Sequence, residues 1–180
     1  MASPDITADE SVQPTGGSQT HEQELVRRAQ MGSSAAFERL VVERGPELYR
    51  YLALRLRNES DARDALQETL TAAWQSLPTL REPAKFWAWL VSIAAHKAAD
   101  AVRSRAPLVL ELEAVGDDGA EAAEIREAFD RLPSRFREVL LLRYGLQLSE
   151  QEAANVLGVR VGTIKSRSAR ARKALEELLA

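Results

Sequence analysis

Apolar residues recur at three- and four-residue intervals along most of the chain, a period typical of amphipathic helices. In the N-terminal half the pattern begins near Glu22. It is interrupted at Gly45 and Pro46, where we expect a helix to end, and it resumes at Leu48. The first half of the chain is therefore predicted to be helical from about residue 22 onward.

Capping signals define two further helices before the middle of the chain. The Ser-Asp pair at 60–61 is expected to cap a helix that ends near Ser76. A loop should follow over 77–82, and Pro83 suits the first turn of a long helix that ends near Arg105.

The helical pattern then breaks at a segment with prolines, glycines and acids, and a second helical unit follows it. Alternation typical of strands is not sustained anywhere in the sequence. The fold class is therefore predicted to be all-α, with two small helical domains joined by a flexible acidic linker. The expected divisions are a disordered tail at 1–21, a first domain at 22–105, the linker at 106–121 and a second domain at 122–180.

The second domain carries a helix-turn-helix signature. Ser149 and Glu152 have the spacing of a capping box, which predicts the start of its first helix. Two crossed helices need a small residue, a glycine at the turn and a branched apolar residue, and Ala154, Gly158 and Ile164 supply them. The second helix of the motif is predicted over 162–179.

Basic residues crowd that second helix. Six occur between positions 160 and 173 without an acid among them: Arg160, Lys165, Arg167, Arg170, Arg172 and Lys173. Cationic side chains on phosphates supply most non-specific DNA affinity, and Arg or Lys can also donate to guanine in the major groove. A basic helix end that is merely solvated is the alternative, but the adjacent helix-turn-helix favours DNA binding.

The apolar stripe of the same helix contains a polar residue. It runs through Ile164, Ser168, Ala171, Leu175 and Leu178, so the Ser168 hydroxyl falls in the middle of the predicted packing face. Either the neighbouring helices approach closely over small residues or the site is underpacked. We favour underpacking, because a domain of this size has little core to spare.

Acidic and basic residues are distributed unevenly along the chain, although the net charge is small. The chain of 180 residues has 24 basic and 27 acidic residues and a net charge of −3. Acids are concentrated in the first 26 residues and at 106–125, segments in which there is no Lys or Arg. The predicted DNA surface is therefore left basic.

Composition argues against several other classes of protein. Cysteine is absent, and the histidines at positions 21 and 96 are too few and too distant to suggest a metal site, so we expect no metal and no cofactor. Enzymatic motifs, such as a glycine-rich phosphate loop or a nucleophile elbow, are also absent, so we do not expect an enzyme. Without an apolar stretch of about 20 residues or a signal peptide, we expect a cytoplasmic protein with no membrane insertion.

Four segments together resemble a known family. They are DARDALQETLTAAW at 61–74, FWAWLVSIAAHKAAD at 86–100, RLPSRFREVLLLRY at 131–144 and LSEQEAANVLGVRVGTIKSRSARARKAL at 148–175. The first two are similar to the second conserved region, and the last two to the fourth, of bacterial sigma factors of the extracytoplasmic-function type. The resemblance implies a sigma initiation factor whose partners are core RNA polymerase and promoter DNA. A dedicated anti-sigma protein is common in the family, although no feature of this sequence requires one.

The resemblance implies that the 61–74 motif docks on the clamp helices of RNA polymerase. The matching polar positions are Asp64, Gln67 and Glu68, whose spacing places them on one helical face. Solvated surface residues without a partner are the alternative interpretation.

The 86–100 motif implies recognition and melting of the minus-ten promoter element, beside a loop over 77–85 that captures an unstacked base in the family. The residues assigned to it are Phe86, Trp87, Trp89, His96, Lys97 and Arg103. Phe86 and Trp89 also fit a structural role, and Trp87 fits core filling and base stacking equally well. Ala95 and His96 stand where relatives commonly have Arg-Asn, which changes the groups available to the minus-ten strand.

The 148–175 motif implies recognition of the minus-thirty-five element. The residues assigned to it are Arg160, Thr163, Lys165, Ser166, Arg167, Arg170 and Lys173. Two rival hypotheses remain: a helix-turn-helix regulator that binds operators independently of polymerase, and an interaction protein that sequesters polymerase or a regulator.

Overall fold

The computed structural model describes residues 16–104 and 120–179, and every regular element within these two ranges is helical, as predicted. The first range contains α1 (Gly16–Gln30), α2 (Ser34–Leu56), α3 (Glu59–Ser76) and α4 (Phe86–Ser104), with short 3-10 turns at Leu77–Thr79 and Pro83–Lys85. The second contains α5 (Ala120–Arg131), α6 (Ser134–Leu140), a π-turn at Leu141–Gly145, α7 (Glu150–Leu157) and α8 (Val161–Leu179). The predicted tail up to residue 15 and most of the predicted linker lie outside the described residues.

Two helices differ from the sequence-based prediction in the first half of the chain. The first helix begins at Gly16, earlier than the expected start near Glu22. The expected break at Gly45 and Pro46 was wrong, because α2 continues through both residues to Leu56. A proline inside a helix costs about 3 kcal/mol. Leu40, Leu48 and Leu52, on either side of Pro46, are all buried. Burial of each side chain contributes about 1.5–3 kcal/mol, which together outweighs the cost of the proline.

The cap of α3 also differs from the prediction. Asn58, rather than the Ser-Asp pair at 60–61, caps the helix, since its side chain accepts a hydrogen bond of 2.9 Å from the backbone N–H of Asp61. Arg57 ends α2 in a left-handed conformation, with φ of 53°, so the chain reverses direction and Asn58 is extended. Several residues near this point can act as caps, and the tight turn selects the one that has the extended backbone.

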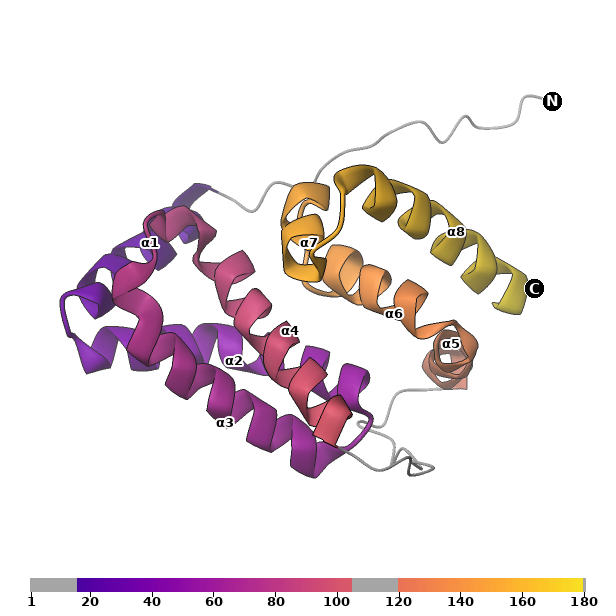
Figure 1. The fold of residues 1–180 in the computed structure, drawn as a ribbon, viewed down its shortest axis with the longest axis horizontal. Coiled ribbons are helices and arrows are strands. Elements are labelled where there is room, and N and C mark those ends of the chain that lie inside the picture. The colour runs from indigo at the N-terminus through magenta and orange to yellow at the C-terminus, as the bar shows by residue number, and fades with distance from the viewer. Residues whose placement is uncertain (1–15, 105–119, 180) are drawn as a thin grey trace.

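The helices form two groups that lie against each other (Figure 1). We call α1 to α4 the N-terminal domain and α5 to α8 the C-terminal domain. Helix α4 packs against α2 and α3 on one side and against α7 on the other. Most buried apolar side chains of the described residues therefore belong to one cluster, which runs from Leu25 in α1 to Ile164 in α8. Leu132, Leu140 and Ala171 form a second, smaller cluster within the C-terminal domain.

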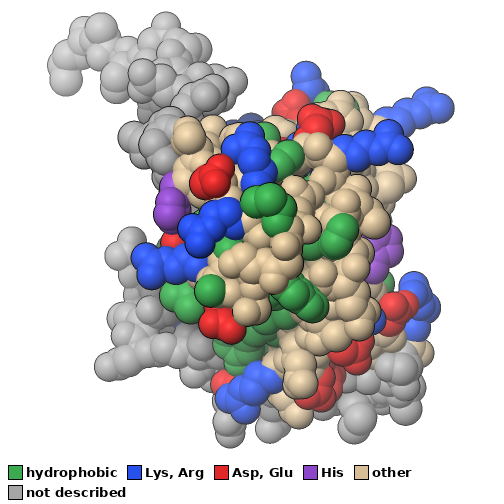
Figure 2. Space-filling model, turned by 90° about the vertical axis from the view of Figure 1, so that its left-hand side faces the viewer, with side chains coloured by type: hydrophobic (Ala, Val, Ile, Leu, Met, Phe, Trp, Pro, Cys, Tyr) green, Lys and Arg blue, Asp and Glu red, His purple; other side chains and the backbone are tan. Residues whose placement is uncertain are grey.

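The face at the α1 end of the N-terminal domain carries side chains of both charges among its described residues (Figure 2). Figure 2 shows green apolar side chains there, interspersed with blue basic and red acidic ones. Among the described residues of this face in Figure 2, basic and acidic side chains are therefore mixed.

The helix-turn-helix forms as the sequence predicts. Ser149 and Glu152 make the capping box, with the Glu152 carboxylate accepting from the Ser149 N–H at 2.8 Å. Gly158 closes α7 in the left-handed region, with φ of 62°. Ala154 and Ile164 are buried where α7 and α8 cross. The predictions that Ala154 is the small residue at the crossing, Gly158 the turn glycine and Ile164 the branched apolar residue are confirmed.

The polar residue in the stripe of α8 is buried as expected. Ser168 is 7% exposed, and its hydroxyl has no hydrogen-bond partner among the described residues. Its neighbours along the stripe, Ile164 and Ala171, are fully buried. A buried hydroxyl without a partner loses its hydration and gains nothing in return, at a cost of about 1–3 kcal/mol.

Two substitutions of Ser168 distinguish the destabilisation caused by its unpaired hydroxyl from underpacking of the site. Ser168→Ala should raise the thermal unfolding midpoint of the full chain, because it removes the unpaired hydroxyl. Ser168→Leu should raise it further if the site is underpacked, since burying the larger side chain contributes about 1.5–3 kcal/mol. A midpoint raised by alanine but lowered by leucine would mean that the helices already approach closely, because overpacking costs about 1–3 kcal/mol.

Candidate nucleic-acid interface

The predicted polymerase-docking residues lie together on an exposed face of α3. Asp64, Gln67 and Glu68 are all exposed and line an open groove of about 400 Å³. Lys97 of α4 forms the opposite wall, with its Nζ 3.1 Å from a Glu68 carboxylate oxygen. The structure thus places the three side chains on one accessible surface, as their spacing indicates.

The aromatic residues at the start of α4 divide into different environments. Phe86 is only 1% exposed and belongs to the core. Its assignment to the minus-ten DNA surface was wrong for this conformation, because a ring enclosed by other side chains cannot stack on a base. Trp89 is half-buried, with its ring centroid 6.0 Å from that of Phe86, so it packs against the same core.

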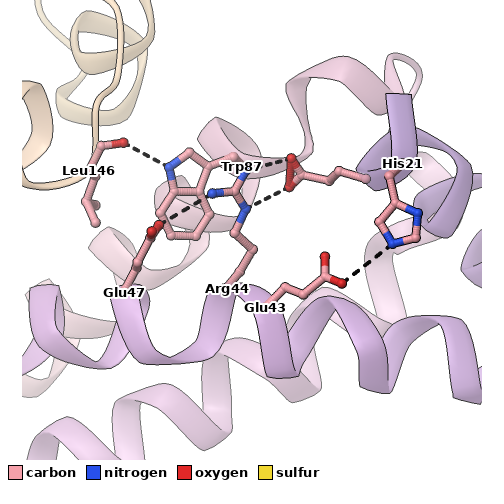
Figure 3. Close-up of polar contacts among 7 residues, drawn as sticks. His21, Glu43, Arg44, Glu47, Trp87 and Leu146 are labelled. Atoms are coloured by element: carbon pink, nitrogen blue, oxygen red, sulfur yellow. Dashed lines mark hydrogen bonds and ion pairs between the residues drawn. The ribbon is translucent and has the colours of Figure 1, made fainter. Parts of the chain in front are cut away.

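Trp87 contacts the other domain. Its indole Nε1 donates a hydrogen bond of 3.0 Å to the backbone carbonyl of Leu146, 59 residues further along the chain (Figure 3). Leu146 follows the π-turn at the end of α6 and is itself buried. Trp87 is half-buried and packs against the main apolar cluster, which agrees with core filling, one of the two alternatives that the sequence left open. The interdomain hydrogen bond of its indole was not among them.

Arg44 of α2 stacks on the Trp87 ring from within the N-terminal domain. Its guanidinium carbon lies 4.9 Å from the ring centroid, a cation–π contact. The same guanidinium donates to both carboxylate oxygens of Glu22, at 2.9 and 2.7 Å, and lies 3.4 Å from an oxygen of Glu47. These hydrogen bonds raise the pKa of Arg44 above its usual value, although burial opposes the shift. The sequence offers no signal for this cluster, because Glu22 and Trp87 come from separate helices.

The remaining residues assigned to the minus-ten element lie along α4. His96 is exposed, and its Nδ1 lies 2.6 Å from the carbonyl oxygen of Ser92, one turn earlier. Arg103 is exposed and pairs with Asp100 on the same helix. The structure therefore leaves His96 and Arg103 accessible, whereas it engages Lys97 with Glu68.

Helix α8 presents basic and hydroxyl side chains on the side opposite its buried stripe. Thr163, Ser166, Arg170 and Lys173 follow one another at three- and four-residue steps, and Arg170 and Lys173 are exposed. The Ser166 hydroxyl donates to the Thr163 carbonyl at 3.1 Å. The face formed by these four residues is what a DNA groove would meet, and we call it the α8 outer face.

Three other basic residues assigned to the minus-thirty-five element lie beside that face. Arg167 is half-buried at the edge of the stripe, and Arg160 is exposed just before the helix begins. Lys165 is exposed, and its Nζ lies 3.6 Å from a carboxylate oxygen of Glu150 on α7. An exposed pair of this kind contributes little stability, so the ammonium can exchange Glu150 for a phosphate.

Within residues 16–104 and 120–179, the structure contains no group of three or more histidine, cysteine or carboxylate residues placed to hold a metal ion. In the same two ranges no helix has the length and apolar character needed to cross a membrane.

The geometry defines a two-domain helical DNA-binding protein with a helix-turn-helix in its second domain. Two family models match the chain: "Sigma-70 region 2" over residues 40–107 and "Sigma-70, region 4" over residues 122–175. The matches coincide with the α3 and α4 surfaces and with the helix-turn-helix.

Individual relatives agree with these matches. RNA polymerase sigma factor NccH of Alcaligenes xylosoxydans xylosoxydans is 33% identical over 176 residues, which cover 86% of this chain and 92% of the relative. ECF RNA polymerase sigma factor SigM of Mycobacterium tuberculosis is 32% identical, covering 87% and 83%. The solved structure of CnrH in complex with the cytosolic domain of CnrY is 31% identical, with a TM-score of 0.70, and covers 88% of this chain and 97% of that one.

The chain belongs to the extracytoplasmic-function (ECF) family of RNA polymerase sigma factors. It is a sigma initiation factor, a DNA-binding regulatory protein that directs core RNA polymerase to initiate transcription at specific promoters.

Proposed function

We propose that the α3 groove of the N-terminal domain binds core RNA polymerase and that the α8 outer face of the C-terminal domain binds promoter DNA. Asp64, Gln67 and Glu68 would dock the N-terminal domain on core RNA polymerase. The observation that carries this assignment is their common exposure along a single open groove, where a helix of the polymerase can reach all three. The charged residues of the groove are acidic apart from Lys97, so we expect it to meet a surface that includes basic residues.

The C-terminal domain would read the minus-thirty-five element with α8. Support comes from the position of Arg170 and Lys173 opposite the buried stripe, since a helix that enters the major groove must turn its packed side away from the duplex. Thr163 and Ser166 lie nearer the N-terminus of the helix, and their small side chains allow the backbone to approach the DNA. Lys165, Arg167 and Arg160 would contact phosphates or bases from beside this face.

Helix α4 would engage the minus-ten element with exposed residues rather than with its core. His96 and Arg103 are accessible there, and Lys97 becomes available if polymerase takes over Glu68. Trp87 could stack on an unpaired base only after the C-terminal domain releases it. Phe86 and Trp89 would pack beneath this surface and hold α4 in position.

An anti-sigma protein is a further proposed partner. CnrH, which this chain resembles over 88% of its length, was solved in complex with the cytosolic domain of CnrY. We expect the protein to act in the cytoplasm, where polymerase and chromosomal DNA are found, and to carry no catalytic activity of its own.

Transcription by core enzyme tests the proposed assignments. Purified core RNA polymerase, supplied with this protein and a pool of genomic DNA fragments, should produce short transcripts that start at a defined subset of sites. A regulator that acts independently of polymerase would bind fragments without starting transcripts on core enzyme. A sequestering protein would suppress initiation by an added housekeeping sigma factor and start none.

A further inference from the structure

The connection between α3 and α4 is held by a side chain from α1. Gln30, the last residue of α1, donates from its carboxamide Nε2 to the backbone carbonyls of Leu77, at 3.1 Å, and Leu80, at 2.7 Å. A carboxamide nitrogen has two N–H groups, so one side chain satisfies both acceptors, and only the nitrogen end of the amide can face two carbonyl oxygens. We call this pair of hydrogen bonds the Gln30 bridge.

The backbone that carries Gln30 is itself fixed. Ala29 is buried in the core, and Gly32 follows the helix in the left-handed region, with φ of 93°. The N–H groups of Gly32 and Ser33 bond back to carbonyls in the last turn of α1, at 2.9 and 3.1 Å. Gln30 is half-buried, so its carboxamide is held against the connection from a rigid helix end.

The Gln30 bridge also determines which groups of the connection face away from α1. The Leu80 carbonyl turns inward to Gln30, and the peptide between Leu80 and Arg81 is trans. Because a trans peptide directs its N–H opposite to its carbonyl, the Arg81 N–H points away from Gln30. Within residues 16–104 and 120–179, neither this N–H nor the exposed Arg81 guanidinium has a hydrogen-bond or ion-pair partner. The connection therefore presents an unpaired backbone donor and a cation on the same residue.

These two groups lie next to the helix that we propose binds the minus-ten element. The connection runs beside α1 (Figure 1), and its second 3-10 turn, Pro83–Lys85, contacts both α1 and α4. An unpaired base has carbonyl and ring-nitrogen acceptors for a backbone N–H, and the phosphates beside it attract a guanidinium. The chemistry of Arg81 therefore fits a single DNA strand that reaches the start of α4.

We propose that Gln30 is a positioning residue for minus-ten recognition. It does not touch DNA, but its bridge holds Arg81 and the rest of the connection in the orientation that receives an unpaired base. This inference rests on the proposed function, in which this end of the N-terminal domain binds the minus-ten element. Without the bridge, the Leu77 and Leu80 carbonyls lose their partner on α1 and the connection samples other orientations. Capture of a base must then order the connection again, which lowers the affinity.

Substitutions of Gln30 remove the donors or restore them. Gln30→Glu keeps the size of the side chain but places a carboxylate, which can only accept, against two carbonyl oxygens. Gln30→Met removes the donors without adding charge. Gln30→Lys supplies N–H donors again from a side chain of similar length. Gln23→Glu is the matched control, because it makes the same chemical change at another half-buried position of α1, two helical turns earlier.

A thermodynamic cycle with abasic DNA measures the coupling between Gln30 and a single base. The probes are forked duplexes with a single-stranded minus-ten segment, taken from a promoter that the transcription assay identifies and bound by core polymerase with the full chain. For the unsubstituted protein, removal of the captured base should weaken binding about 5- to 150-fold, the range expected from loss of one stacked base. For Gln30→Glu and Gln30→Met, removal of the same base should change affinity less than about twofold, whereas Gln30→Lys and Gln23→Glu should retain the sensitivity.

The cycle separates positioning from a purely structural role of Gln30. A destabilised domain would bind every probe more weakly, intact or abasic, and would unfold at a lower temperature. Loss of positioning should instead act at one base position and leave core polymerase binding unchanged. Equal weakening at all positions, an unsubstituted protein that is insensitive to every abasic site, or a Gln30→Glu variant with unchanged sensitivity would overturn the inference even if the protein initiates transcription. A protein that gives no promoter-specific transcript would overturn the proposed function, and this inference with it.

Discussion

Replacing Asp64, Gln67 and Glu68 together by alanine is expected to abolish co-purification of the protein with core RNA polymerase. The three side chains share one exposed groove, and the substitutions remove two carboxylates and an amide at once. Truncating a hot-spot residue of an interface costs about 2 kcal/mol or more, so if two of the three are hot spots the triple variant should lose about a thousandfold in affinity. Helical circular dichroism should not change, because none of the three packs in the core.

Two controls make that result specific. A matched triple variant on the same helix, with Glu59, Ser60 and Arg63 changed to alanine, alters exposed polar positions near its first turn, outside the groove, and should bind core enzyme normally. Lys97→Ala tests whether the triple variant acts only by freeing the lysine from Glu68. Core binding that survives the triple substitution would exclude this face as the docking surface.

The helix-turn-helix could be predicted in detail because its determinants are local. The capping box needs only Ser149 and Glu152, and the turn needs only a residue that tolerates the left-handed region, which Gly158 does. The stripe of α8 follows directly from helical periodicity, including the unfavourable position of Ser168.

The errors in the first half of the chain arose where tertiary packing overrode a local signal. Pro46 is a strong local stop signal, but burial of the leucines on both sides of it keeps α2 continuous. The cap of α3 depends on the left-handed turn at Arg57, and a non-glycine residue in that conformation is not apparent from sequence.

The interdomain contacts were beyond prediction for a different reason. Trp87 and Leu146 are 59 residues apart, and the acceptor is a backbone carbonyl, which any residue has. Arg44 and Glu22 are one ion pair among many possible ones in a chain with 24 basic and 27 acidic residues. Sequence could assign Trp87 an unusual position, but only the fold could identify its partner.

DNA binding by the C-terminal domain should depend steeply on salt. For an isolated fragment of residues 122–180 that contacts roughly three to five phosphates, log affinity for a minus-thirty-five duplex should fall with log salt concentration at a slope of about −3 to −4.5. Between about 50 and 200 mM salt this corresponds to a decrease of about 60- to 500-fold in affinity, measurable by fluorescence anisotropy. A slope near zero would mean that the basic residues of α8 are only a solvated surface.

The structure refines which cations should carry this dependence. Arg170 and Lys173 lie on the α8 outer face, so alanine at either position should reduce the steepness of the slope by about 0.9 for each phosphate that the side chain neutralises. Arg172 is exposed on the flank that carries Lys165, two turns further from the N-terminus of the helix. Because a recognition helix contacts DNA mainly through its N-terminal residues, Arg172→Ala removes equal charge and should change the slope less than alanine at Arg170 does. Lys165→Ala and Arg167→Ala should also weaken binding. Whichever of them relaxes sequence preference as well is the base reader, because a phosphate-binding side chain strengthens binding to all sequences alike. If Arg170→Ala and Arg172→Ala reduce DNA affinity equally, affinity depends only on the net charge of α8. The helix would then not enter the groove by its outer face.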